Sequence, residues 1–290
     1  MAGKGKGIFA AAAFACAAAF APSVWAGPVI LGGDDLGDHG SFDGTNNLQG
    51  WLYIQNALAN LLSGVTRPGN DGTIVVLGAA PSVPATATPT SSDGCGAAYW
   101  PGQKLVPVRT VTCIDTATGI NTFFANLAAG TANPAVIVYP GDNVGNDVDA
   151  AEEAALAANA GAIANFVASG GGLLGHDGAY TWLSALVPGI ITGGSCSSSA
   201  ATLTPAGIAA FPTVTNADIR AGPCHGSFSG NLGGLGILAL DSSGLNFIIG
   251  GGSTTTFAPV SRDIPTMSEW TMLLMALLLA SLGAYALRRR

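Results

Sequence analysis

Short apolar runs bounded by glycine alternate along the chain with longer segments whose apolar residues recur every three or four positions. The short runs show no polar alternation, which is typical of strands buried on both faces of a sheet. They predict strands at residues 28–33, 73–78, 104–113, 135–139, 171–175, 236–240 and 246–250. The periodic segments predict helices at residues 48–63, 120–129, 149–169 and 180–186. We therefore expect an α/β fold with a doubly wound, mostly parallel, flavodoxin-like sheet in three layers.

Two local features refine this pattern. Pro107 removes a backbone donor from the third predicted strand, so we place that strand near a sheet edge. Asp149, Glu152 and Glu153 lie in the first turn of the 149–169 helix, where negative charge interacts favourably with the helix dipole.

The end of the chain combines an apolar run with positive charge. Residues 271–287 contain no charged side chain, and Trp270 and Tyr285 lie near the two ends of this run. Three arginines follow at 288–290. A membrane-spanning helix needs about 17 to 25 mainly apolar residues, and clustered arginine stays on the cytoplasmic side. We expect a transmembrane helix at 271–287 in the lipid bilayer of the inner membrane, with a cytoplasmic C-terminus and the bulk of the chain exported.

The residues around this helix form a recognisable motif. They are Ile264, Pro265, Thr266, Met267, Trp270, Arg288, Arg289 and Arg290. Their order resembles the IPTL-CTERM sorting signal of Gram-negative bacteria, in which Leu is usual at the position of Met267. The resemblance implies recognition and processing by an exosortase-type membrane enzyme, followed by release to the cell surface or outside the cell.

The first 26 residues predict a signal peptide. Two lysines precede an Ala-rich apolar run, and Val24 and Ala26 supply the small residues expected at positions −3 and −1 of a cleavage site. Cleavage after Ala26 leaves Gly27 as the new N-terminus.

Four cysteines remain beyond the signal peptide: Cys95, Cys113, Cys196 and Cys224. An even number in an exported chain predicts two disulfides. Three pairings are possible, and we favour Cys95–Cys113 with Cys196–Cys224 because these close the shortest loops. No pair has the C-x-x-C spacing of a zinc ribbon, so we do not expect sulfur to bind a metal.

Composition limits the partners of the exported part. Residues 27–263 carry 16 acidic and 5 basic residues, a formal charge of −11. Nucleic acid and anionic lipid both require a basic face, so we expect neither as a partner of this part. We divide the chain into a signal peptide at 1–26, an exported α/β domain at 27–250, a linker at 251–263 and the sorting signal at 264–290.

A second resemblance lies within the exported domain. Residues 163–189 contain a helix, a Gly-rich turn, a strand and a sharp turn that carries His176. This arrangement is similar to the class I glutamine amidotransferase-like fold, and especially to its ThuA-like branch, over roughly residues 135–189. Amidotransferases have a catalytic cysteine on that turn, where this chain has His176 and Asp177. The resemblance therefore implies the fold without glutaminase chemistry.

Scarce histidines and aspartates cluster at the predicted carboxyl ends of strands, where open α/β sheets bind ligands. The candidate catalytic residues are Asp35, His39, His176, Asp177 and His225. A divalent metal such as zinc, manganese or iron would use Asp34, Asp35, His39 and His176. Calcium would use Asp34, Asp35, Asp38 and Asp43, although their spacing is not that of an EF-hand loop.

A structural interpretation competes with these chemical ones. Aspartate after a strand often caps a helix or ties a turn, and histidine in a Gly-rich loop often only hydrogen-bonds the backbone. The sequence HGSF occurs at both 39–42 and 225–228. It would place two similar turns side by side, or it arises by chance in a Gly/Ser-rich chain, and we favour chance. The polar run at 195–199 lacks the G-x-S-x-G pattern of a serine hydrolase.

We therefore expect an exported cell-envelope protein whose domain is a binding or structural module. The alternative is a ThuA-like hydrolase or sugar-modifying enzyme that uses the His/Asp crevice. In an enzyme, the three histidines and Asp35 should surround one cavity. In a binding or structural module, they should scatter or be consumed by hydrogen bonds in turns.

Overall fold

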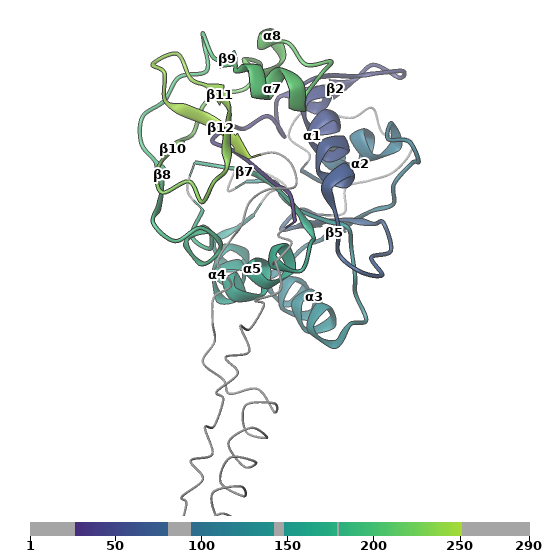
Figure 1. Ribbon diagram of the computed structural model, residues 1–290. Helices are drawn as coiled ribbons and strands as arrows, with labels where there is room; N and C mark the ends of the chain where they lie inside the picture. The colour runs from purple at the N-terminus through teal and green to yellow at the C-terminus, as the bar shows by residue number, and fades with distance from the viewer. Residues whose placement is uncertain (1–26, 81–93, 142–147, 179, 251–290) are drawn as a thin grey trace, which may run out of the picture. The chain divides into compact units, whose positions relative to one another are not determined.

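The computed structural model describes residues 27–80, 94–141, 148–178 and 180–250. A ten-stranded mixed sheet runs through this part of the chain (Figure 1). The predicted signal peptide, linker, transmembrane helix and sorting signal all fall outside the described residues. Within those residues, no helix is long and apolar enough to cross a membrane.

Five parallel strands form one half of the sheet. They are β1 (Val29–Gly32), β4 (Ile74–Leu77), β5 (Val111–Ile114), β6 (Val136–Tyr139) and β7 (Gly172–His176). Their order in space is β5-β4-β6-β7-β1. Every residue of β1, β4, β6 and β7 is buried, as their unbroken apolar runs predict, whereas β5 is partly exposed at the sheet edge.

Antiparallel strands form the other half. They are β8 (Ile190–Gly193), β9 (Thr202–Leu203), β10 (Ser227–Gly230), β11 (Gly236–Leu240) and β12 (Asn246–Gly250). The halves join where β12 pairs with β1, and β10 and β8 follow outward from β12. A separate hairpin is made by β2 (Gly40–Phe42) and β3 (Asn47–Gln49).

The α/β class and the parallel core of the sheet agree with the prediction, but the flavodoxin-like strand order is wrong. A flavodoxin-like sheet has the order 2-1-3-4-5, whereas here the first strand lies beyond the fifth parallel strand. The reason is that β1 is hydrogen-bonded on one side to β7 and on the other side to β12. The first strand is thereby placed at the junction of the two halves.

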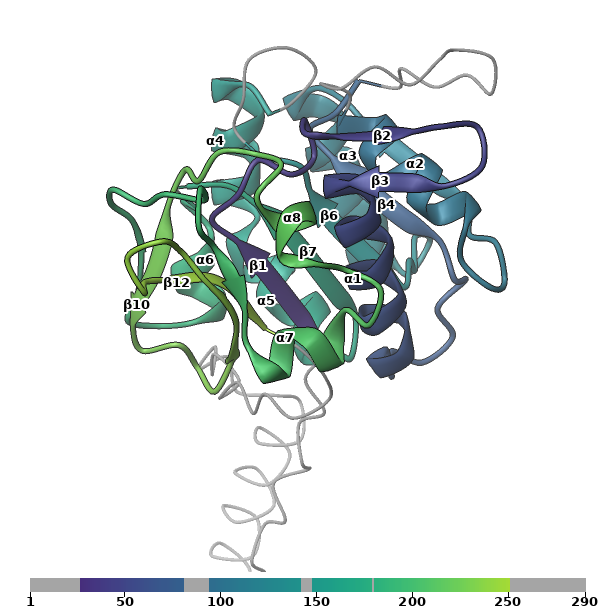
Figure 2. The ribbon, with the colours of Figure 1, turned by 90° about the horizontal axis from the view of Figure 1, so that it is seen from above.

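Helices cover both faces of the sheet (Figure 2). One face carries α1 (Gly50–Gly64) and α2 (Gly94–Gln103), and the other carries α3 (Ala117–Ala129), α4 (Ala150–Ala158) and α5 (Ala160–Ala168). Alternate strand residues enter different cores: Ile30 belongs to the core that contains Trp51 of α1, and Leu31 to the core that contains Phe166 of α5. This two-sided burial makes the three layers. Three shorter helices are α6 (Leu183–Leu186), α7 (Pro205–Ala210) and α8 (Asn216–Ile219).

The helix predicted at 149–169 is two helices, because Asn159 interrupts it. Both the backbone N–H and the side-chain Nδ2 of Asn159 donate to the carbonyl oxygen of Ala155, at 3.1 and 2.8 Å. A side chain that bonds the last carbonyls in this way ends the first helix. At the start of α4, Asp149 and Glu152 form a reciprocal capping box, so the acidic first turn is where the sequence places it.

Two other predicted elements are shorter than expected. The strand predicted at 104–113 begins only at Val111, and the helix α2 and a loop with a cis Val106–Pro107 peptide precede it. As predicted, this strand lies at a sheet edge. The helix predicted from residue 180 comprises only α6.

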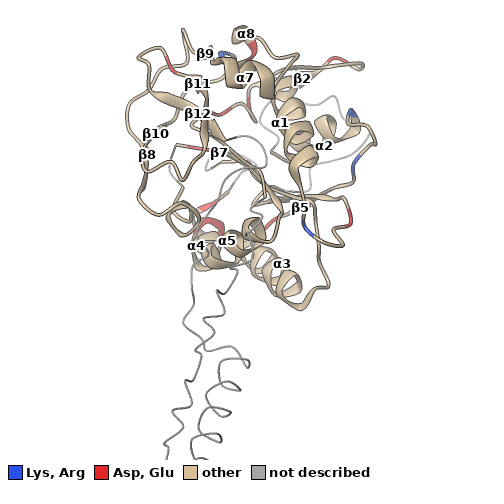
Figure 3. Cartoon of the chain, in the orientation of Figure 1, with Lys and Arg blue, Asp and Glu red and all other residues tan. Residues whose placement is uncertain are grey.

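Both favoured disulfides are present. Cys95–Cys113 joins α2 to β5, and Cys196–Cys224 joins the segment after β8 to the loop before β10. Structural disulfides are typical of exported proteins. The few basic residues are scattered singly over the described part of the chain (Figure 3).

Candidate functional site

The candidate residues meet at the carboxyl ends of β1 and β7. Gly32 at the end of β1 lies directly opposite His176 at the end of β7. The backbone N–H of Asp177 donates to the carbonyl oxygen of Gly32 at 3.0 Å, which continues this pairing beyond the strands. Asp34, which follows β1, is therefore brought beside His176, as the parallel-sheet argument predicts.

Asp34 and His176 form a buried pair. His176 Nδ1 and Asp34 Oδ1 are 2.7 Å apart, and the two side chains are 1% and 0% exposed. The same Asp34 oxygen accepts the N–H of Leu36 at 3.0 Å, so it also holds the turn after β1. Asp34 Oδ2 and His176 Nε2 are both buried and have no hydrogen-bond partner. A cavity of about 10 Å³, room for about one water molecule, adjoins His176.

Asp35, His39 and His225 form a second group, nearer the surface. The Nε2 atoms of His39 and His225 lie 3.4 and 3.5 Å from the same oxygen, Asp35 Oδ2. The side chains of His39 and His225 are 42% and 33% exposed, and that of Asp35 is 10% exposed. This group joins the loop after β1 to the loop before β10, two segments far apart in the sequence.

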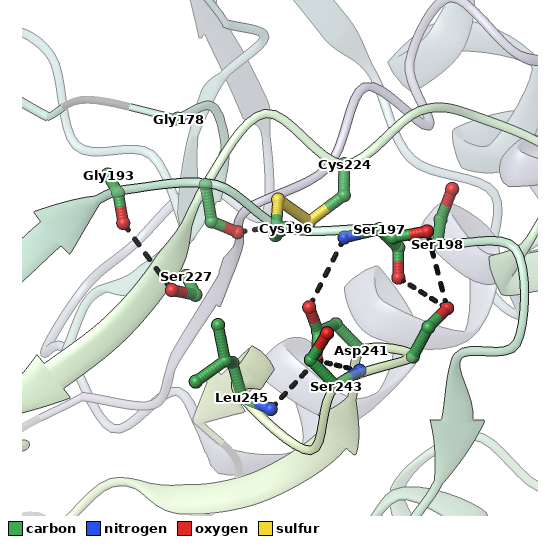
Figure 4. The surroundings of a disulfide bond; sticks show 12 residues. Gly178, Gly193, Cys196, Ser197, Ser198, Cys224, Ser227, Asp241, Ser243 and Leu245 are labelled. Atoms are coloured by element: carbon green, nitrogen blue, oxygen red, sulfur yellow. Dashed lines mark hydrogen bonds between the residues drawn. A yellow bond between two sulfur atoms is a disulfide. The ribbon is translucent and has the colours of Figure 1, made fainter.

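A disulfide and backbone bonds place His225 in this group. Cys224 pairs with Cys196 (Figure 4) and forms an isolated antiparallel bridge with Asp34. The backbone N–H of His225 then donates to the carbonyl oxygen of Gly33 at 2.8 Å. Both HGSF repeats thus start with a histidine facing Asp35 and continue into a strand, β2 or β10. The two copies of the repeat therefore occupy similar positions beside Asp35.

Asp177 faces away from the His176 group. Its Oδ2 accepts the hydroxyl of Tyr139 at 2.9 Å, and Tyr139 belongs to the core on the α5 side of the sheet. His176 instead lies edge-on to Tyr53, in the core on the α1 side, with ring centroids 5.8 Å apart. Successive residues of an extended chain point to opposite faces. The sequence prediction therefore grouped two neighbours that the fold separates.

The aspartates proposed for calcium do not gather. Asp43 lies in the turn of the β2–β3 hairpin, where its Oδ1 accepts the N–H groups of Thr45 and Asn46 at 2.8 and 2.7 Å. These backbone hydrogen bonds, that of Asn46 first, lower the pKa of the Asp43 carboxyl. Among the described residues, no three or more His, Cys, Asp or Glu side chains are arranged to hold a metal ion.

A larger cavity lies elsewhere. It has a volume of about 500 Å³, lies between β5 and α3, and is lined mainly by threonine and asparagine, with Phe123 and Ile114 among its apolar residues. None of the candidate site residues lines it.

Asp241 is a buried aspartate that the sequence analysis did not single out. It stabilises the disulfide region through hydrogen bonds (Figure 4). The carboxylate of Asp241, which is 4% exposed, accepts the N–H groups of Ser197, Ser243 and Leu245 at 3.2, 2.7 and 2.8 Å. It therefore ties the segment after Cys196 to the β11–β12 turn. The Asp-Ser-Ser-Gly sequence at 241–244 is typical of a turn, and it could have indicated this role of Asp241.

Comparison with known proteins identifies one segment. Residues 264–290 match the IPTL-CTERM motif, so the chain carries a C-terminal sorting signal of this type. No curated protein and no solved structure matches the chain. The similarity to the glutamine amidotransferase-like fold is not confirmed by any match. The sorting motif and the two disulfides together indicate an exported protein of the cell envelope.

We expect the two His/Asp groups to respond differently to substitution. Asp34→Ala should lower the free energy of unfolding by about 3 kcal/mol, because it leaves buried donors without an acceptor. His39→Ala, at an exposed position, should change it by less than about 0.5 kcal/mol. Urea unfolding of both variants measures this difference, and equal, small effects would contradict a structural role for Asp34.

Three buried tyrosines should make the domain sensitive to alkali. Burial raises the pKa of Tyr53, Tyr139 and Tyr180, and nearby carboxylates, Asp34 or Asp177, raise each further. An unfolded tyrosine has a pKa of about 10, so the folded state keeps protons that the unfolded state releases above this pH. Stability is complete below about pH 10 and falls as pH rises beyond it.

The expected result is that phenolate absorbance appears together with the loss of secondary structure by circular dichroism. The same protein in urea should titrate near the ordinary tyrosine pKa and serves as the control. Gradual ionisation of all tyrosines in a domain that stays folded would show that Tyr53, Tyr139 and Tyr180 are accessible to solvent.

Proposed function

We propose that the protein is an exported envelope protein whose α/β domain is a binding or structural module, delivered through processing of its C-terminal signal by an exosortase-type enzyme. The match of residues 264–290 to the sorting motif supports the delivery step. A transmembrane helix at 271–287 would hold the chain at the inner membrane until that step.

The burial of Asp34 and His176 supports a role without catalysis. Their side chains are 0% and 1% exposed, so neither can touch a substrate in this conformation. Asp34 also holds the turn at Leu36, and Asp43 and Asp241 accept backbone N–H groups of their own turns. These three carboxylates are thus used to hold turns of the fold, which is the pattern expected for a binding or structural module.

Replacing Pro265 or Trp270 tests the delivery step. Either Pro265→Ala or Trp270→Ala should cause the unprocessed, membrane-held form to accumulate, because both residues belong to the recognised motif. Membrane fractionation with immunoblotting measures this, and Ser268→Ala, at a motif position where the residue varies, is the matched control. Normal processing of both motif variants would count against the sorting assignment.

A ThuA-like hydrolase or sugar-modifying enzyme is the second candidate. The convergence of His39 and His225 on Asp35 favours it, because a partly exposed His/Asp group is suited to acid–base chemistry. Among the described residues, no three His, Cys, Asp or Glu side chains are arranged to hold a metal.

Adding metal ions tests whether the group around Asp35 is a metal site. We expect zinc, manganese and calcium to leave the melting temperature of the purified protein unchanged, and elemental analysis to find no stoichiometric metal. A rise in melting temperature that His225→Ala abolishes and Asp43→Ala retains would instead establish a metal site at Asp35.

A further inference from the structure

Gly27, the residue after the predicted cleavage point, is buried where the chain enters β1. Its backbone N–H donates to the carbonyl oxygen of Val167 at 2.7 Å. Val167 lies in the last turn of α5, so the Gly27 nitrogen occupies the C-terminal end of that helix. The last carbonyls of a helix carry the negative end of the helix dipole. The Val167 carbonyl accepts the N–H of Gly170 at 2.9 Å as well as that of Gly27.

The space around Gly27 is closely fitted. A β-carbon at this residue would lie 1.9 Å from the carbonyl oxygen of Gly171, so only glycine can be accommodated without a shift of the backbone. The next residue, Pro28, is buried, and its carbonyl oxygen accepts the N–H of Leu173 in β7 at 3.0 Å. The start of the exported domain is therefore fixed to both α5 and β7.

We propose that the amino group released by cleavage after Ala26 binds as an ammonium ion at the C-terminal end of α5. This inference rests on the proposed export and adds an intramolecular site for the mature terminus. The ammonium brings a positive charge and further donors to a position where the Gly27 nitrogen already bonds Val167. A cation at a helix C-terminus is favourable, and this contact offsets part of the cost of burying the charge.

Cleavage itself is a hydrolysis of the bond between the Ala26 carbonyl carbon and the Gly27 nitrogen. Water supplies the second oxygen of the Ala26 carboxylate, and its two protons convert the Gly27 N–H into an ammonium ion. A protease must reach this bond, but in the folded domain Gly27 is buried and its N–H is engaged. Cleavage therefore precedes the packing of residue 27 against α5, and a chain that folds first keeps its leader.

The exported sequence provides an internal control for this site. Lys104 is the only lysine after residue 26, and it is exposed. Processed protein is purified from an exporting host, its N-terminus is confirmed by mass spectrometry, and its two amines are acetylated briefly at neutral pH. An ordinary α-amino group, with a pKa of about 7.7–8.0, reacts before a lysine with a pKa of about 10.4. In urea we expect this ordinary order.

In the folded protein we expect acetylation of Gly27 to be slowed about fivefold relative to urea, with Lys104 as the internal reference for reagent activity. Inserting one serine between Ala26 and Gly27 moves the amino group away from Val167. This variant should regain fast acetylation and lose about two- to fivefold in its folding equilibrium constant.

Two results would overturn the proposal: rapid acetylation of Gly27 in processed, folded protein, or full protection of the amino group in the serine-insertion variant. Recovery of protein with its leader intact would refute the processing step on which the proposal rests. These outcomes are independent of the Pro265 and Trp270 variants, which test C-terminal sorting alone.

Discussion

The parallel pairing of β1 with β7 is the contact on which the centre of the domain depends. It sets Gly32 opposite His176, and this register brings Asp34 within hydrogen-bond distance of His176. The other edge of β1 is paired with β12, so one short strand joins the parallel and antiparallel halves. All four residues of β1 are buried, so their backbone groups must find partners within the protein. The neighbouring strands supply most of them, and the Gly32 carbonyl also accepts the hydroxyl of Tyr180 at 2.6 Å.

How much of the fold could be predicted depended on how each element is buried. Strands β1, β4, β6 and β7 are buried on both faces, so their apolar runs are visible in the sequence. Strands β8 and β10 contain a single buried residue between them, Phe228, and they include Thr, Ser and Gly, so no long apolar run marks them. The break at Asn159 depends on one side chain that bonds back to Ala155, which helical periodicity does not reveal.

The position of the candidate site was predicted, because strand ends are visible in the sequence. The division of its residues into a His176 group and an Asp35 group was not predicted. The alternation of side chains along β7 and beyond it places His176 and Asp177 on opposite faces, and this could have been deduced from strand periodicity alone. The separation of the His39, His225 and Asp35 group from His176 could not, because it depends on the backbone bond from His225 to Gly33. Long-range contacts of this kind leave no local pattern.

The scarcity of basic side chains also bears on survival in the cell envelope. Enzymes of the trypsin type cut after lysine and arginine, and the described part of the domain has only Arg67, Lys104, Arg109 and Arg220. The residue after Arg67 is Pro68, which such enzymes cut poorly. A domain with so few cleavage points is well suited to an environment where secreted peptidases are abundant and no cytosolic chaperone is available to restore a damaged chain.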